Sequence, residues 1–389
     1  MRDTADSWKR MTSKTFFPNL DGLRFIAFFL VFWQHISAGL FQALRNDGIL
    51  DDSHARFFVT GGLGVSFFFV LSGFLITYLL LQEKLENGKI SLRGFYARRI
   101  LRIFPLYYLV VVFGFVLYPG CRVLFGLPTM DIGNSLLYAT FLGNFDMIAA
   151  ADRPGFIGVL WSLSIEEQFY LVWAVLVAFV PRGLLKYMFL VIVAVSTVFR
   201  FQHAGDDKVL YFHTLSVMSD LAVGAGMAFL AWRYSWFKIR FEGLNRFSIL
   251  GIYFAGFTLI WFYPSLFQID QMAWLQRLLF AVFFAFVIAE QNYAINSLVK
   301  LGNFKLISKL GILTYGLYLL HMIALFFVET LLGRISRFFS DYTNFVFLGI
   351  AGMAGSILLA YLSFEYFETR FLRLKKRFVA KPHFSENRG

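Results

Sequence analysis

Long apolar runs follow one another along the sequence, separated by short polar segments that carry most of the charged residues. Each run is about 20 residues long, the length that a helix needs to cross the hydrocarbon core of a bilayer. A shorter apolar stretch, residues 134–145, cannot cross and predicts a re-entrant or interfacial helix. The pattern therefore predicts an all-α polytopic membrane protein with about ten transmembrane helices. We expect the full spans at residues 21–42, 61–82, 103–119, 159–180, 185–201, 213–232, 247–264, 273–290, 310–330 and 344–364.

The composition agrees with a membrane protein. Of 389 residues, 58% are hydrophobic and only 15% are charged, whereas a soluble domain has about 25% charged residues. The single cysteine, Cys121, excludes an internal disulfide. The first 20 residues are polar and basic, and the run after them is long enough to remain as an anchor, so we expect no cleavable signal peptide.

The basic residues predict the orientation of the chain. With the N-terminus inside, 26 of the 36 Lys and Arg residues fall in the inner segments and 8 in the outer loops. This bias predicts that both termini are cytoplasmic, and it accounts for the net charge of +12 without a nucleic-acid partner. We expect one membrane domain, residues 1–389 with a core at 18–377, located in the cell membrane and without a fused extracytoplasmic domain.

Two ionisable residues share one face of the first span. Arg24 and His35 are 11 residues apart, which is about 20° past three full turns and roughly 16 Å along the axis. Singly, each has an ordinary explanation: an arginine whose charge reaches the membrane surface, and a histidine that bonds a neighbouring helix. Together on one face they indicate the lining of a polar path.

The stretch "WSLSIEEQFY" (161–170) carries two acidic residues into a span. Glu166 and Glu167 lie about two turns from its outer end, which predicts the same depth as His35. Adjacent helical residues point about 100° apart, so only one can face the bundle interior. The alternative is a structural ion pair with an intramembrane arginine.

The stretch "FYARRILRIFP" (95–105) brings Arg98, Arg99 and Arg102 to the inner mouth of the third span. A basic belt at the membrane surface is the ordinary explanation. The functional alternative is phosphate binding, for which forked guanidinium groups are suited.

Two further stretches carry polar residues into spans. His321 lies near the middle of "LGILTYGLYLLHM", with Tyr318 beside it, and either bonds a neighbouring helix or supports catalysis. The stretch "GGLGVSFFFVLSGF" (61–74) contains Ser66 and Ser72 among glycines, which indicates close helix packing.

Taken in order, six stretches resemble motifs of the acyltransferase-3 family of integral membrane acyltransferases: "NLDGLRFIAFFLVFWQH", "GVSFFFVLSGFLI", "FYARRILRIFP", "WSLSIEEQFYLV", "TYGLYLLH" and "FEYFETRFLRL". The resemblance runs from about residue 18 to residue 377. The chain departs from the family pattern at Ser66, where an acidic residue is frequent, and at Thr369, where a proline commonly follows the position of Glu368. Many relatives carry a fused extracytoplasmic esterase-like domain. Because we expect no such domain here, any second acyl-handling step would need another protein.

The resemblance implies transfer of an acyl group, commonly acetyl, from acyl-CoA to a hydroxyl of a glycan or lipid-linked sugar of the cell envelope. Acyl-CoA is then a co-substrate, with no bound cofactor and no metal. The acceptor's identity, the acyl chain length and the oligomeric state stay open. We expect His35 to be the general base and Arg24 to line the path or stabilise the oxyanion. Glu166 or Glu167 would orient His35 or hold the acceptor, and Arg98, Arg99 and Arg102 would bind the donor phosphates. Possible supporting residues are His321, Tyr318, Ser72 and Glu368.

Two other functions also fit these residues. A proton-coupled transporter has intramembrane Arg, His and Glu on a polar route, but the paired, interrupted helices frequent in transporters are not evident. A non-catalytic scaffold leaves the outer-half histidine and glutamates unexplained.

Overall fold

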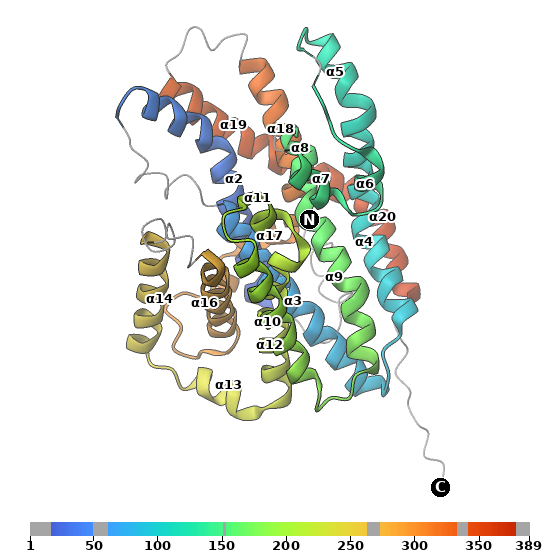
Figure 1. Ribbon diagram of the computed structural model, residues 1–389, viewed down its shortest axis with the longest axis vertical. Helices are drawn as coiled ribbons and strands as arrows, with labels where there is room; N and C mark the ends of the chain where they lie inside the picture. Colours follow the sequence, from blue (N-terminus) through green and yellow to red (C-terminus); the bar gives the residue numbers. More distant parts are fainter. Residues whose placement is uncertain are drawn as a thin grey trace.

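The computed structural model describes residues 17–49, 61–128, 130–150, 153–262, 273–332 and 341–378, and these ranges form helices and connecting turns without a β-strand (Figure 1). The elements are α2 (Pro18–Asn46), α3 (Gly61–Asn87), α4 (Leu92–Val112), η2 (Phe113–Leu117), α5 (Tyr118–Leu124), α6 (Ser135–Ala139), α7 (Gly143–Ala149), α8 (Gly155–Gly158), α9 (Leu160–Phe179), α10 (Leu185–Gln202), α11 (Asp207–Phe212), α12 (Thr214–Arg233), α13 (Ser235–Glu242), α14 (Arg246–Trp261), α16 (Ala273–Tyr293), η3 (Leu301–Asn303), α17 (Lys305–Ile312), α18 (Thr314–Leu332), α19 (Asp341–Leu362), η5 (Ser363–Glu368), α20 (Thr369–Leu374) and η6 (Lys375–Phe378).

The described helices confirm a multi-pass membrane protein with about ten spans. Nine of them are long and apolar enough to cross a bilayer, and α13 with α14 adds a tenth if this pair, bent by 96°, counts as one span. The span expected at 247–264 is therefore the irregular one, since α14 has only 16 residues. The third span also differs: its helix begins at Leu92 instead of 103 and continues to Leu124.

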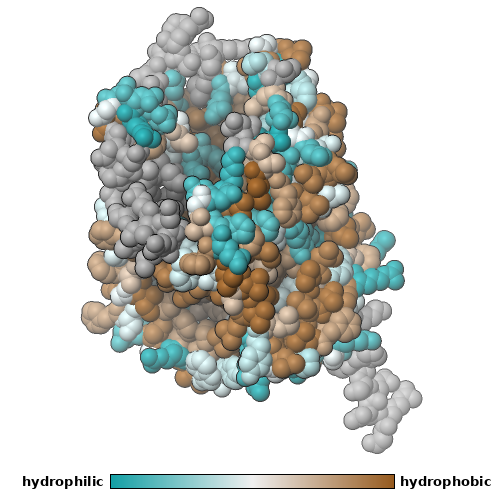
Figure 2. Space-filling model, in the orientation of Figure 1, coloured by the Kyte–Doolittle hydropathy of each residue, from teal (hydrophilic) through white to brown (hydrophobic). Residues whose placement is uncertain are grey.

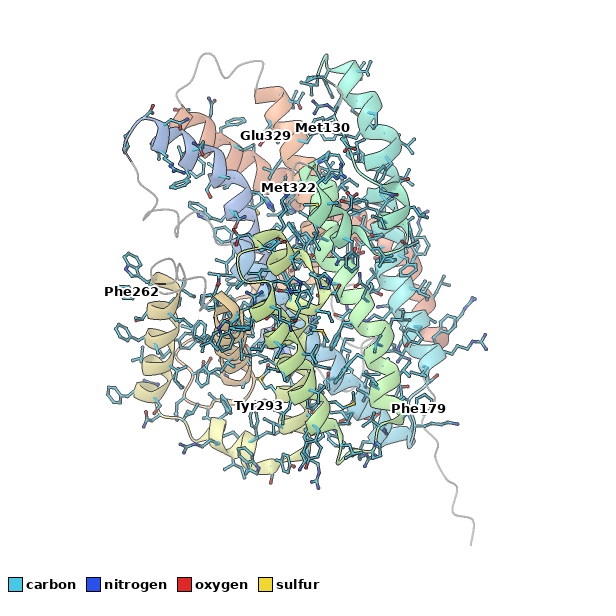
Figure 3. All side chains as sticks on the ribbon, in the orientation of Figure 1. Met130, Phe179, Phe262, Tyr293, Met322 and Glu329 are labelled. Carbon is cyan, nitrogen blue, oxygen red and sulfur yellow. The ribbon has the colours of Figure 1, made fainter. Side chains whose placement is uncertain are left out.

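The outer surface of the bundle is apolar. Figure 2 shows hydrophobic residues over much of the visible face, with hydrophilic groups gathered at its lower edge and over its upper middle. Phe179 is 76% exposed and Phe262 48% exposed, and both lie at the periphery in Figure 3. Large exposed side chains of this kind on a helical bundle indicate contact with lipid.

The tightest helix contact joins α3 and α12. A Cβ added at Gly224 would lie 2.0 Å from the Val70 carbonyl oxygen, and one added at Gly73 would lie 2.0 Å from that of Leu221. The two backbones therefore touch, as expected for small residues at membrane helix interfaces. Within the glycine-rich stretch, Gly64 likewise lies against α2, which confirms its predicted role in close packing.

An ion pair within the bundle links three helices. Arg277 of α16 donates through Nε to Asp220 of α12 at 2.8 Å, and Ser66 of α3 donates to the same carboxylate at 2.6 Å. Asp220 is fully buried. Because an unpaired charge at this depth would be costly, the three groups form one structural unit.

The short helices α6, α7 and α8 lie against α4 and α9 and are too short to cross a bilayer, as predicted for residues 134–145 (Figure 1). Tyr107 of α4 donates to the Tyr138 carbonyl at 2.7 Å, and Gln168 of α9 donates to the Phe141 carbonyl at 2.8 Å. Arg153 binds Asp146 at 2.7 Å. These bonds hold the non-crossing segment on α4 and α9.

The α3–α12 contact predicts a position where even a small side chain prevents assembly. Replacing Gly224 with Val should abolish monodisperse protein in detergent, because the new side chain would overlap the Val70 carbonyl. Gly251→Val is the control, since a Cβ there meets nothing within 4 Å. Size-exclusion chromatography and thermal melting compare the two, and a well-folded Gly224→Val protein would contradict the contact.

The orientation predicted from the basic residues can be tested by cysteine labelling in a Cys121→Ser background. Asp152, an obvious labelling position, lies outside the described residues, whereas Ser135 is described and exposed. Ser135→Cys should react with an impermeant thiol reagent applied to intact cells, and Arg182→Cys should react only after the cells are opened. The reverse labelling pattern would show that the chain has the opposite orientation.

Candidate active site

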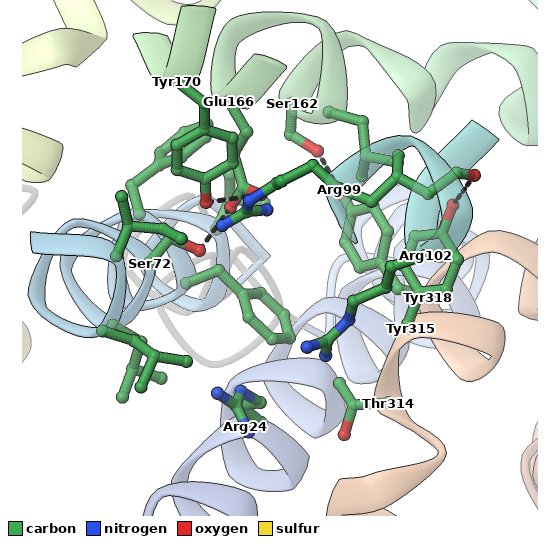
Figure 4. Close-up of a pocket in the computed structure, with 18 of the residues that line it drawn as sticks. Arg24, Ser72, Arg99, Arg102, Ser162, Glu166, Tyr170, Thr314, Tyr315 and Tyr318 are labelled. Atoms are coloured by element: carbon green, nitrogen blue, oxygen red, sulfur yellow. Dashed lines mark hydrogen bonds between the residues drawn. The ribbon is translucent and has the colours of Figure 1, made fainter. Parts of the chain in front are cut away.

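A cavity of about 120 Å³ opens between α2, α3, α4, α9 and α18. The side chains that point into it are shown in Figure 4. Its polar lining consists of Arg24, Ser72, Arg99, Arg102, Ser162, Glu166, Tyr170, Thr314, Tyr315 and Tyr318. Four of these residues are among those predicted from the sequence as catalytic or donor-binding, namely Arg24, Arg99, Arg102 and Glu166.

Three arginines, Arg24, Arg99 and Arg102, line the cavity, and the charges of Arg24 and Arg99 act on Arg102. Arg24 pairs with Asp21 at 2.6 Å, and Arg99 lies over the Tyr170 ring, 3.6 Å from its centroid. Arg102 makes no hydrogen bond and no ion pair with any described residue, and its side chain is exposed to the cavity. The charges of Asp21, Glu166 and Glu368 act on Arg102 without a direct ion pair, which leaves its guanidinium N–H groups free to bind an anion in the cavity.

The two glutamates interact with Arg99, and no hydrogen bond joins either of them to His35 among the described residues, so the role of orienting His35 is not supported. Glu166 accepts hydrogen bonds from Ser72 at 2.7 Å and from Tyr170 at 3.2 Å. Glu167 Oε1 lies 3.9 Å from Arg99 Nη1 and has no hydrogen-bond partner in the described part of the chain. An ion pair with an arginine, the alternative considered for this pair, is therefore what the structure shows.

The start of α4 explains this arrangement. Ser91 caps the helix by accepting a hydrogen bond from the Gly94 N–H. With its first turn at Leu92, the helix carries Arg99 and Arg102 about 10 and 15 Å inward instead of leaving them at the mouth. Glu166 lies about 9 Å into α9 from the opposite side, so the opposite charges meet within the bundle.

Arg98 faces away from the cavity. Its guanidinium donates to Glu83 at 2.8 Å and to the Phe378 carbonyl at 2.7 Å. It therefore ties the end of α3 and the last described turn to α4. Of the three arginines expected at the donor phosphates, Arg99 and Arg102 line the cavity and Arg98 does not.

The last helical segment contributes two further charged groups. Glu368 is buried, ends the π-helix η5 and accepts a hydrogen bond from Ser363 at 2.9 Å. Lys375, in η6, interacts through its charge with Arg98, Arg99 and Arg102. Figure 1 shows α20 beside α4, which brings these groups to the arginines. Sequence reasoning missed Lys375 because it counted the basic run 373–377 only as orientation bias.

At the other end of the cavity the groups are neutral. Ser162 and Tyr318 share a hydrogen bond of 2.7 Å. Behind Tyr318, the His321 ring lies 6.1 Å from the Tyr318 ring, and its Nε2 is 3.1 Å from His35 Nδ1. Arg24 and His35 thus stand toward opposite ends of the site, with only Arg24 in the cavity wall.

This arrangement separates two chemical tasks. The cationic end can bind an anion, and the histidine end can accept a proton from a neutral nucleophile. In the described part of the chain, no group of three His, Cys, Asp or Glu residues is placed to hold a metal ion.

Comparison with known proteins assigns the family. The model of the acyltransferase-3 family, described as an acyltransferase domain, matches residues 17–363. The peptidoglycan O-acetyltransferase OatA of Listeria monocytogenes is 27% identical over 97% of this chain and 60% of its own length. The O-acetyltransferase OatA of Staphylococcus aureus strain NCTC 8325 is 28% identical over 100% of this chain and 62% of its own length. The chain therefore spans about three fifths of these relatives. No solved structure matches it. With most of its length matched, the chain belongs to the acyltransferase-3 family.

Proposed function

We propose that this protein is a membrane O-acyltransferase that moves an acyl group, commonly acetyl, from acyl-CoA to a hydroxyl of a cell-envelope glycan or lipid-linked sugar. The relatives named O-acetyltransferases support the reaction type, and the one named for peptidoglycan supports a glycan acceptor. The single observation that carries the donor assignment is Arg102, whose guanidinium lines the cavity and makes no hydrogen bond or ion pair with a described residue.

The charges around Arg102 favour a polyanionic donor. Arg24 and Arg99 line the cavity with Arg102, and the charge of Lys375 acts on Arg99 and Arg102. The nearby carboxylates have partners of their own: Asp21 pairs with Arg24, and Glu166 accepts from Ser72 and Tyr170. Like charges gathered in a low-dielectric region repel one another, and an anion bound among them removes that cost. Guanidinium groups bind phosphate oxygens in pairs, so the phosphates of coenzyme A fit this end.

The acyl transfer itself needs a base, which we assign to His35. The acceptor hydroxyl oxygen attacks the thioester carbonyl carbon while His35 takes the hydroxyl proton. A C–O bond forms and the C–S bond breaks. The coenzyme A thiolate leaves and receives that proton from His35. Ser162 and Tyr318 lie where the cavity meets the histidines. When Ser162 donates the hydrogen bond that they share, the Tyr318 hydroxyl can donate to the carbonyl oxygen as charge develops.

Replacing the proposed base should stop transfer without unfolding the protein. In His35→Ala, turnover of labelled acetyl-CoA with solubilised peptidoglycan in proteoliposomes should fall by about 100-fold or more, because general-base catalysis contributes at least that much. His203→Ala, at the exposed end of α10 and stacked on Phe199, is the control and should retain activity. Near wild-type turnover in His35→Ala would remove the assignment.

Removing a donor-binding cation should weaken the binding of acyl-CoA selectively. Arg102→Gln and Lys375→Gln should each raise the KM for acetyl-CoA about ten- to hundredfold, the loss of one charge-assisted hydrogen bond. The KM for acetyl-pantetheine, which lacks the phosphates, should rise much less. Lys376→Gln is the matched control, because Lys376 lies in the same turn and is exposed. An equal rise in KM for both donors would contradict phosphate recognition.

A further inference from the structure

His321 occupies a fully buried position on α18, and its hydrogen bonds determine where its proton lies. Its Nδ1 is 2.8 Å from the Tyr318 carbonyl oxygen and 3.2 Å from that of Leu317. A carbonyl oxygen only accepts hydrogen bonds, so Nδ1 must carry a hydrogen. In a neutral imidazole, the other nitrogen, Nε2, is then an acceptor.

The acceptor nitrogen of His321 points at His35. The distance from His321 Nε2 to His35 Nδ1 is 3.1 Å, a normal hydrogen-bond length. Since Nε2 accepts, His35 Nδ1 must donate. The remaining nitrogen of His35, Nε2, then bears the free electron pair, and no described residue hydrogen-bonds to it.

The surroundings of His321 favour the neutral ring. Phe28 and Phe32 of α2 pack on it, with ring centroids 5.6 and 6.3 Å away. The titratable groups that face it are His35 on α2 and Tyr318 on its own helix, and no described carboxylate contacts either histidine. An imidazolium here would be a buried, unpaired charge, which is costly.

We propose that His321 is a positioning residue that holds His35 in the tautomer with a hydrogen on Nδ1 and a basic Nε2. The backbone carbonyls of α18 fix His321, and His321 in turn fixes His35. When His35 Nε2 takes the hydroxyl proton, the resulting imidazolium keeps its Nδ1–H bond to His321. A neutral imidazole here does the orienting that a carboxylate does in a Ser-His-Asp triad. The catalytic consequence rests on the proposed function, whereas the tautomer does not.

Two substitutions separate this role from simple helix packing. His321→Leu removes the acceptor, while His321→Gln places an amide oxygen about where Nε2 lies. We expect kcat to fall about 100-fold or more in His321→Leu, with the KM for acetyl-CoA changed less than about threefold. His321→Gln should recover most of the lost kcat. Equal kcat losses in both variants together with lowered melting temperatures, or full activity in His321→Leu, would overturn the proposal.

Nitrogen NMR of protein labelled with ¹⁵N-histidine tests the tautomer without any activity. The His35 signals, identified by their loss in His35→Ala, should show a protonated Nδ1 and an unprotonated Nε2 in the wild type. An Nε2-protonated His35 in the wild type would overturn the proposal even if acyl transfer is observed. The expected tautomer in a protein that transfers no acyl group would instead leave the pairing intact and remove the proposed function.

Discussion

Within a bilayer, an ionisable side chain has to find an opposite charge, a set of hydrogen bonds or a water-filled cavity, and this constraint organises the whole site. Asp220 and Arg277 satisfy it by pairing, and Glu166 by accepting from Ser72 and Tyr170. Arg102 makes no hydrogen bond or ion pair with a described residue; the charges of Asp21, Glu166 and Glu368 act on it without direct contact, and its guanidinium lines the cavity. A guanidinium whose N–H groups bond no described residue keeps its donors available for an anion that enters the cavity.

The helix packing serves the same constraint. Gly73 and Gly224 let α3 and α12 approach until their backbones touch, and Gly311 lets α17 approach the Asp21 carbonyl of α2. Close approach at these points holds Ser72 opposite Glu166, and the Asp21–Arg24 pair at the cavity. Small residues at these interfaces therefore position the charged residues, and replacing a single glycine would displace side chains of the site.

Most of the fold was predictable because the lengths of apolar runs follow directly from bilayer thickness. The arrangement of the site was less predictable. Arg24, Arg99, Arg102 and Glu166 were recognisable as polar residues in apolar runs, but which of them meet depends on where each helix begins. Placing the third span at 103 instead of Leu92 left the arginines at the surface and sent the glutamates to His35. The pairing of His35 with His321, 286 residues away, has no signature in the sequence.

The spacing along α2 bears on the kind of donor that fits. Arg24 and His35 are separated by three turns, roughly 16 Å along the axis. An acyl phosphate carries its phosphate directly on the reacting carbonyl, so it could not touch both ends of such a site. Acyl-CoA places a long, flexible pantetheine arm between its phosphates and its thioester. In the function that we propose, the arm would lie in the cavity lined by Phe68, Leu71 and Tyr318, with the phosphates at the arginines. The separation of charge binding from proton transfer is therefore itself an argument for a donor whose anionic and reactive ends are far apart.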